Sequence, residues 1–102
     1  MSKPKIIYGI TDVDSEGYAA GNETYTSLYT TRDKALEEAY KCYFAAFNGL
    51  CGDNGVDANG SAILSKEQFF EEMLNEDGGN YVLIQLYDSH RQFEYFEREL
   101  ID

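Results

Sequence analysis

The residues of this chain that could do chemistry are mostly carboxylates, and the densest group lies between residues 66 and 77. One Lys is followed there by four Glu and one Asp, with a spacing of four between Glu67 and Glu71 and between Glu72 and Glu76. Side chains four residues apart share a helix face, and like charges at that spacing repel by a few tenths of a kcal/mol per pair. Because carboxylates accept bidentate hydrogen bonds from Arg, such a face suits contact with a basic partner.

A second acidic segment has the spacing of a calcium loop. In an EF-hand loop, oxygen ligands at positions 1, 3, 5 and 12 surround the ion, and a Gly at position 6 allows the sharp turn. Residues 12–23 match positions 1, 3, 6 and 12 and have Glu at position 5, so the possible ligands are Asp12, Asp14, Glu16 and Glu23. The flank does not fit, since residues 5–11 have the pattern of a strand where an EF-hand needs a helix.

A third segment, 57–68, also resembles a calcium loop, with Asp57, Asn59 and Ser61 at positions 1, 3 and 5. It departs from the pattern at position 6, which is Ala, and at position 12, where Gln68 lacks the bidentate carboxylate. Several glycines also interrupt the approach to this loop, where a helix should precede it. A degenerate EF-hand-like calcium-binding module is therefore the alternative interpretation, and the leading interpretation requires no cofactor or metal.

Nucleophilic and phosphate chemistry have weaker support. Cys42 and His90 could be paired as nucleophile and base, as in any chain with one of each. Cys42 falls next to the apolar face of a predicted helix, which favours a small core residue instead. The Gly-rich segment 52–60 lacks the Lys-Ser/Thr ending of a phosphate loop. We therefore expect a non-enzymatic protein.

The overall composition predicts a folded domain with a strong negative field. The 102 residues contain 19 Asp and Glu against 8 Lys and Arg, a net charge of −11. Yet 43% of the chain is apolar and 15% is aromatic, which a disordered acidic tail would lack. This size fits one domain over residues 1–102. The charge argues against direct binding of nucleic acid or an anionic membrane and favours a basic protein target.

The compartment is predicted from the cysteines and the first residues. Cys42 and Cys51 lie nine apart with no zinc-site spacing, so free thiols in a reducing compartment are expected. The first residues lack an apolar stretch of signal-peptide length, and no segment is long and apolar enough to span a membrane. These features indicate a cytoplasmic protein.

Hydrophobic periodicity predicts the strands that position these groups. Strands are expected over 5–11 and 24–30, with the polar segment 12–23 between them as a loop. A third strand over 81–87 is apolar on both faces and is expected at the centre of the sheet. The last segment, 92–101, fits a helix stripe or an aromatic-rich strand, and we favour the strand.

Two helices are predicted between the strands. The first is capped by Thr30 or Thr31 and runs to about residue 47, where Asn-Gly ends it. A loop over 49–62 follows, and a Ser-x-x-Gln capping box begins the second helix, 66–76. The order predicts a single α+β domain in which two helices pack on one face of an antiparallel sheet of three to four strands.

In size, charge, compact α+β order and acidic helix, the chain resembles the small acidic inhibitors of phages and other mobile elements. These include anti-CRISPR proteins and DNA-mimic anti-restriction proteins, and the helix concerned is Lys66-Glu67-Gln68-Phe69-Phe70-Glu71-Glu72. The resemblance implies a protein that acts in the host cytoplasm on a nucleic-acid-binding target. An acidic interaction or assembly subunit is a further alternative. From the charges, we expect a contact face that comprises Asp53, Asp57, Glu67, Glu71, Glu72, Glu76 and Asp77.

Overall fold

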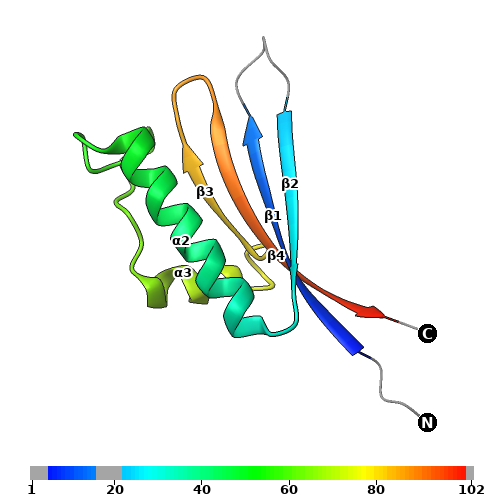
Figure 1. The fold of residues 1–102 in the computed structure, drawn as a ribbon. Helices are drawn as coiled ribbons and strands as arrows, with labels where there is room; N and C mark the ends of the chain where they lie inside the picture. Colours follow the sequence, from blue (N-terminus) through cyan, green and yellow to red (C-terminus); the bar gives the residue numbers. More distant parts are fainter. Residues whose placement is uncertain (1–4, 16–21, 101–102) are drawn as a thin grey trace.

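The computed structural model describes residues 5–15 and 22–100, and this part of the chain contains one four-stranded antiparallel sheet. Its strands are β1 (Lys5–Ser15), β2 (Asn22–Tyr29), β3 (Tyr81–Gln85) and β4 (His90–Leu100). They lie in the order β2-β1-β4-β3, so the two longest strands are central (Figure 1). The predicted α+β class and antiparallel sheet are therefore confirmed.

Two predictions about the strands were wrong. Segment 12–23, predicted as a loop, belongs to strands at both ends, because β1 and β2 stay paired as far as Ser15 and Asn22. β3 lies at an edge of the sheet and ends at Gln85, although its apolar faces predicted a central strand continuing to residue 87. Apolar residues on both faces of β3 do not show whether the strand is central. Val82 and Ile84 are buried on one face, while Tyr81 is exposed on the other and Leu83 is half-buried there.

The final segment is a strand, as favoured. β4 pairs with β1 over eleven residues, from Lys5↔Leu100 to Ser15↔His90. It pairs on its other side with all five residues of β3. This double pairing decides against the helix that the spacing of Phe93, Phe96 and Leu100 would also allow.

The two described helices lie on one face of the sheet, as predicted (Figure 1). α2 (Arg32–Cys51) is capped by Thr31, whose side chain accepts a hydrogen bond from the backbone N of Lys34. It continues four residues beyond the predicted end, because Asn48 and Gly49 stay helical and Cys51 is buried. α3 (Lys66–Met73) begins with the predicted capping box but ends three residues early.

The core lies between these helices and the sheet, and aromatic rings fill its centre. The Tyr43 ring lies 5.0 Å from that of Phe69 and 6.1 Å from that of Phe93, centroid to centroid. The Tyr43 hydroxyl accepts a hydrogen bond from the backbone N of Leu64, so this buried polar group is satisfied. Tyr43 therefore joins α2, α3 and β4 at a single point.

The opposite face of the sheet has no described helix over it. There Gly9 of β1 lies directly across from Phe96 of β4, and the Phe96 ring covers the glycine. A Cβ on Gly9 would lie only 2.1 Å from Cζ of that ring. Gly9 is therefore required by close approach and not by backbone conformation.

We expect Gly9→Ala to lower the free energy of unfolding by about 1–3 kcal/mol, because the methyl group would push the Phe96 ring away. Urea denaturation measures this cost. The same substitution in a Phe96→Ala background should cost clearly less, since the ring is gone. Equal costs in both backgrounds would show that the ring contact is not the reason for glycine at this position.

Candidate functional site

Five of the predicted contact residues lie together on α3 and the turn after it, and we call them the acidic segment: Glu67, Glu71, Glu72, Glu76 and Asp77. α3 buries Phe69 and Met73 completely against the rest of the fold. All five acidic side chains are consequently exposed. None forms an ion pair with another residue in the described part of the chain. The sequence also has no Lys or Arg between Lys66 and Arg91 that could neutralise them.

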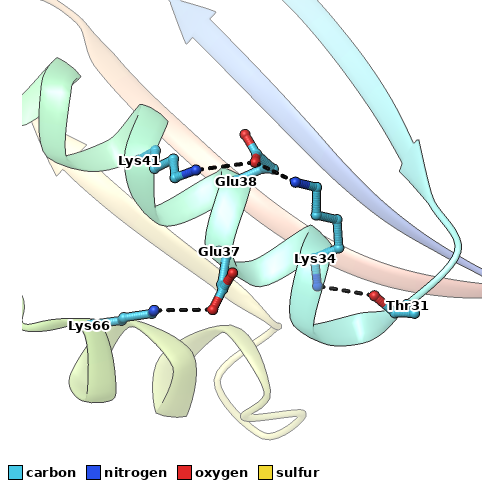
Figure 2. Close-up of polar contacts among 6 residues, drawn as sticks. All are labelled: Thr31, Lys34, Glu37, Glu38, Lys41 and Lys66. Carbon is cyan, nitrogen blue, oxygen red and sulfur yellow. Dashed lines mark hydrogen bonds and ion pairs between the residues drawn. The ribbon is translucent and has the colours of Figure 1, made fainter.

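Acids outside the acidic segment hold most of the described cations. On α2, Glu38 Oε1 lies 3.0 Å from Lys34 Nζ and 3.4 Å from Lys41 Nζ, and these contacts lower the pKa of Glu38 (Figure 2). Lys66, the one cation of α3, reaches back 3.2 Å to Glu37 instead of neutralising its own helix. The α2 surface is thereby close to neutral, while the acidic segment keeps its charge.

Asp57 was predicted as a contact residue, but the structure gives it a structural role. Its side chain is buried, and the carboxylate accepts hydrogen bonds from the backbone N of Asn59, Ser61 and Gln85 at 2.9, 3.0 and 3.2 Å. These bonds close the turn 57–61 and join it to β3. Asp-Ala-Asn-Gly is a typical Asx-turn sequence, which was the signal for this role.

Asp53 is exposed, as a contact residue should be, but it is separated from the acidic segment. It lies in the turn that follows Cys51, beyond one end of α2. Figure 1 shows this turn at the far end of α2 from the part of that helix that crosses α3. Of the seven residues predicted to form the contact face, the structure therefore places together only the five of the acidic segment.

The described residues of the first calcium-like segment, 12–15 and 22–23, lie on two paired strands. Arg91 donates to both carboxylate oxygens of Asp12, at 3.0 and 2.7 Å, while Asp14 pairs across the sheet with Glu23. Glu16 lies outside the described residues. Over residues 5–15 and 22–100, no group of three or more His, Cys, Asp or Glu side chains has an arrangement that could hold a metal ion.

The second calcium-like segment forms a capped turn. The backbone N–H groups of Asn59 and Ser61 both donate to Asp57 Oδ1. The carboxylate that was predicted as a calcium ligand therefore accepts hydrogen bonds from the other two predicted ligand residues. In an EF-hand, by contrast, the side-chain oxygens at these positions point to the ion.

The two cysteines are free, as predicted, but the prediction that Cys42 lies in the core was wrong. Cys42 is exposed, and Cys51 is the buried one, where burial raises the pKa of its thiol. His90 is half-buried at the start of β4. Among the described residues, no hydrogen bond joins Cys42 and His90.

A titratable cluster links the start of α2 to β4. The Tyr95 hydroxyl donates to Glu97 Oε2 at 2.6 Å and accepts from Arg32 Nε at 3.3 Å, while Arg32 Nη2 lies 3.0 Å from the same Glu97 oxygen. Burial first, and then the bond to Glu97, raise the pKa of Tyr95 to about 12, and the Tyr95 bond lowers the pKa of Glu97. Both groups therefore keep one protonation state near neutral pH, as expected for a structural clamp.

Comparisons of the chain with models of protein families, with curated proteins and with solved structures give no match. Within the described residues, neither helix has both the length and the apolar character that crossing a membrane requires.

Asp57→Ala should lower the free energy of unfolding by about 2–3 kcal/mol, because three backbone N–H groups lose a charged acceptor. Asp57→Asn should cost less, since the amide oxygen can still accept the bonds from Asn59 and Ser61. Urea denaturation of both variants, with and without calcium, measures the effect. A calcium-dependent gain in stability that Asp57→Asn abolishes would instead support the calcium alternative.

Tyr95 should also make stability depend on alkaline pH. The unfolded Tyr releases its proton near its ordinary pKa of 10.0, while the folded one holds it to about 12. Between these values the unfolded state binds fewer protons, so stability falls as pH rises. Wild type should lose on the order of 2 kcal/mol more than Tyr95→Phe over this window in urea denaturation. Parallel losses in the two proteins would contradict the assignment.

Proposed function

We propose that this chain is a non-enzymatic acidic protein that binds a basic target and occupies the site where that target holds nucleic acid. The observation that carries the proposal is the uneven use of the few cations. Acids of α2 and the sheet engage Arg32, Lys34, Lys41, Lys66 and Arg91. The acidic segment engages none of the described cations, so its charge remains available to a partner.

The target chemistry follows from this charge. A nucleic-acid-binding groove displays Arg and Lys that neutralise phosphates and release counterions on binding. Carboxylates accept the same bidentate Arg hydrogen bonds that phosphates do. A rigid acidic surface can therefore compete for such a groove. In this respect the chain is similar to anti-CRISPR and DNA-mimic anti-restriction proteins, and we propose the same mode of action for it.

The arrangement of α3 favours binding over stability. Its last turn contains no basic residue, although a cation there would interact favourably with the negative end of the helix dipole. Glu76 and Asp77 follow that end after Leu74 and Asn75 and add to the negative potential. A charge pattern that opposes local folding preferences is typical of functional sites. The capping box and the buried Phe69 hold the helix in place, which lowers the cost of ordering it on binding.

The proposal predicts the effect of reversing charge in the acidic segment. The immobilised protein would be used to capture proteins from a nuclease-treated lysate, and retained proteins would be eluted with a salt gradient. Each captured protein would then be purified and tested for displacement from labelled DNA or RNA. Glu71→Lys/Glu76→Lys/Asp77→Lys should weaken binding to such a target at least about tenfold at low salt, because the steering field is removed.

A matched control variant is Asp53→Lys/Asp88→Lys/Glu99→Lys, which makes the same change in net charge at three exposed acids elsewhere. It should retain most of the affinity. Equal loss in the two variants would mean that net charge alone is responsible and would favour the alternative of an acidic assembly subunit. A target that binds with the same affinity at all salt concentrations, or that binds nucleic acid simultaneously, would contradict the proposal.

A further inference from the structure

The outer edge of β3 is only partly covered. At Gln85, the backbone N donates to Asp57 Oδ2 at 3.2 Å, and the backbone O accepts from the N of Ala58 at 2.7 Å. Residue 85 therefore points its backbone groups away from β4. Backbone groups of alternate residues in an antiparallel ladder point to the same side. Leu83 and Tyr81 consequently present their N–H and C=O groups to this outer edge as well.

The ladder on the other side of β3 agrees with this assignment. The backbone N of Tyr95 donates to the O of Asn80, and that of Leu86 donates to the O of Ser89. Even-numbered residues of β3 thus point to β4. Among the described residues, the outward groups of Leu83 and Tyr81 have no hydrogen-bond partner outside the sheet. They form a short open edge beside the part that the turn 57–61 covers.

A cleft of about 260 Å³ lies along this open edge. Tyr43 and Phe47 of α2 and Val82 contribute apolar lining, and the segment after Ser61 forms the facing wall. The volume is below the ~300–1,000 Å³ of pockets that enclose small molecules. An extended chain that lies along β3 would place one side chain here.

The charge beside this edge specifies what kind of chain fits. Glu72 lines the cleft, and Glu76 and Asp77 lie in the turn that leads into β3. No Lys or Arg occurs in the sequence between residues 66 and 91 to attract an acidic peptide. The edge of β2 is also open along one side, but it has no acidic segment beside it and its Glu23 already accepts a hydrogen bond from Tyr25.

We propose that the outer edge of β3 at Tyr81–Leu83 binds an extended basic segment of the target as an added β-strand. Main-chain hydrogen bonds to Leu83 would provide affinity, and a side chain in the cleft with Lys or Arg on either side would provide specificity. This inference rests on the proposed function, because it names the part of the target that the acidic segment attracts.

The probe is a synthetic peptide, acetyl-Arg-Lys-Val-Thr-Val-Lys-Arg-amide, titrated into the ¹⁵N-labelled protein. We expect the amide signals of Leu83 and Tyr81 to shift and the Leu83 amide to exchange more slowly with solvent. N-methylation of one central amide of the peptide should weaken binding about two- to tenfold, the effect of one hydrogen bond. N-methylation of the adjacent amide should have little effect, because neighbouring N–H groups of a strand point to opposite sides.

Three results would overturn the proposal: no binding at millimolar peptide, equal effects of the two N-methylations, or shifts confined to the acidic segment or to β2. A version of the peptide with Glu and Asp in place of Arg and Lys serves as the control and should not bind. The two proposals fail separately. Charge reversal could weaken target binding while the peptide leaves the Leu83 amide unaffected. That result would support the proposed function and contradict the proposed strand addition at β3.

Discussion

The packing of Phe69 is the interaction on which the candidate site depends. α3 has only eight residues, and a helix of that length does not form alone in water. It is held because Phe69 is fully buried, with its ring centroid 5.3 Å from that of Tyr40 and 5.0 Å from that of Tyr43. Once Phe69 points inward, the helix period directs the glutamates outward. The core of the fold therefore determines where the acidic surface lies.

The distribution of cations gives that surface its character. Lys66 is placed to neutralise its own helix, yet its Nζ lies 3.2 Å from Glu37 of α2 (Figure 2). This ion pair joins two helices but contributes little stability because both side chains are about half exposed. Its larger effect is electrostatic, since it ties the only cation of α3 to α2. The same few Lys and Arg thus neutralise one helix and leave the other charged.

Much of the fold could be predicted from the sequence, because residues close together in the chain determine where the helices begin and which faces they bury. The capping box at Ser65 and the stripe from Ala35 to Phe47 define helices through contacts within a few residues. The errors came from long-range pairing. Nothing local in β3 reveals that it is an edge strand, and the polar residues of 12–15 join a strand only because β2 and β4 lie on either side. At the candidate site, the five acids of the acidic segment all lie within residues 67–77 and could be found. The bond that joins Asp57 to Gln85, by contrast, spans 28 residues and has no local signal.

Asp57 also shapes the edge that the acidic segment adjoins. Open edges expose proteins to unwanted strand pairing, and natural sheets commonly cover them with loops or charges. The Asp57 carboxylate ties a turn to Gln85 and so covers one end of β3, while Glu72 and the residues after α3 place negative charge beside the rest. These carboxylates repel a second copy of this acidic chain and add nothing to the binding of an uncharged strand. They would attract the basic strand proposed above, so the same charges protect the edge and select its partner.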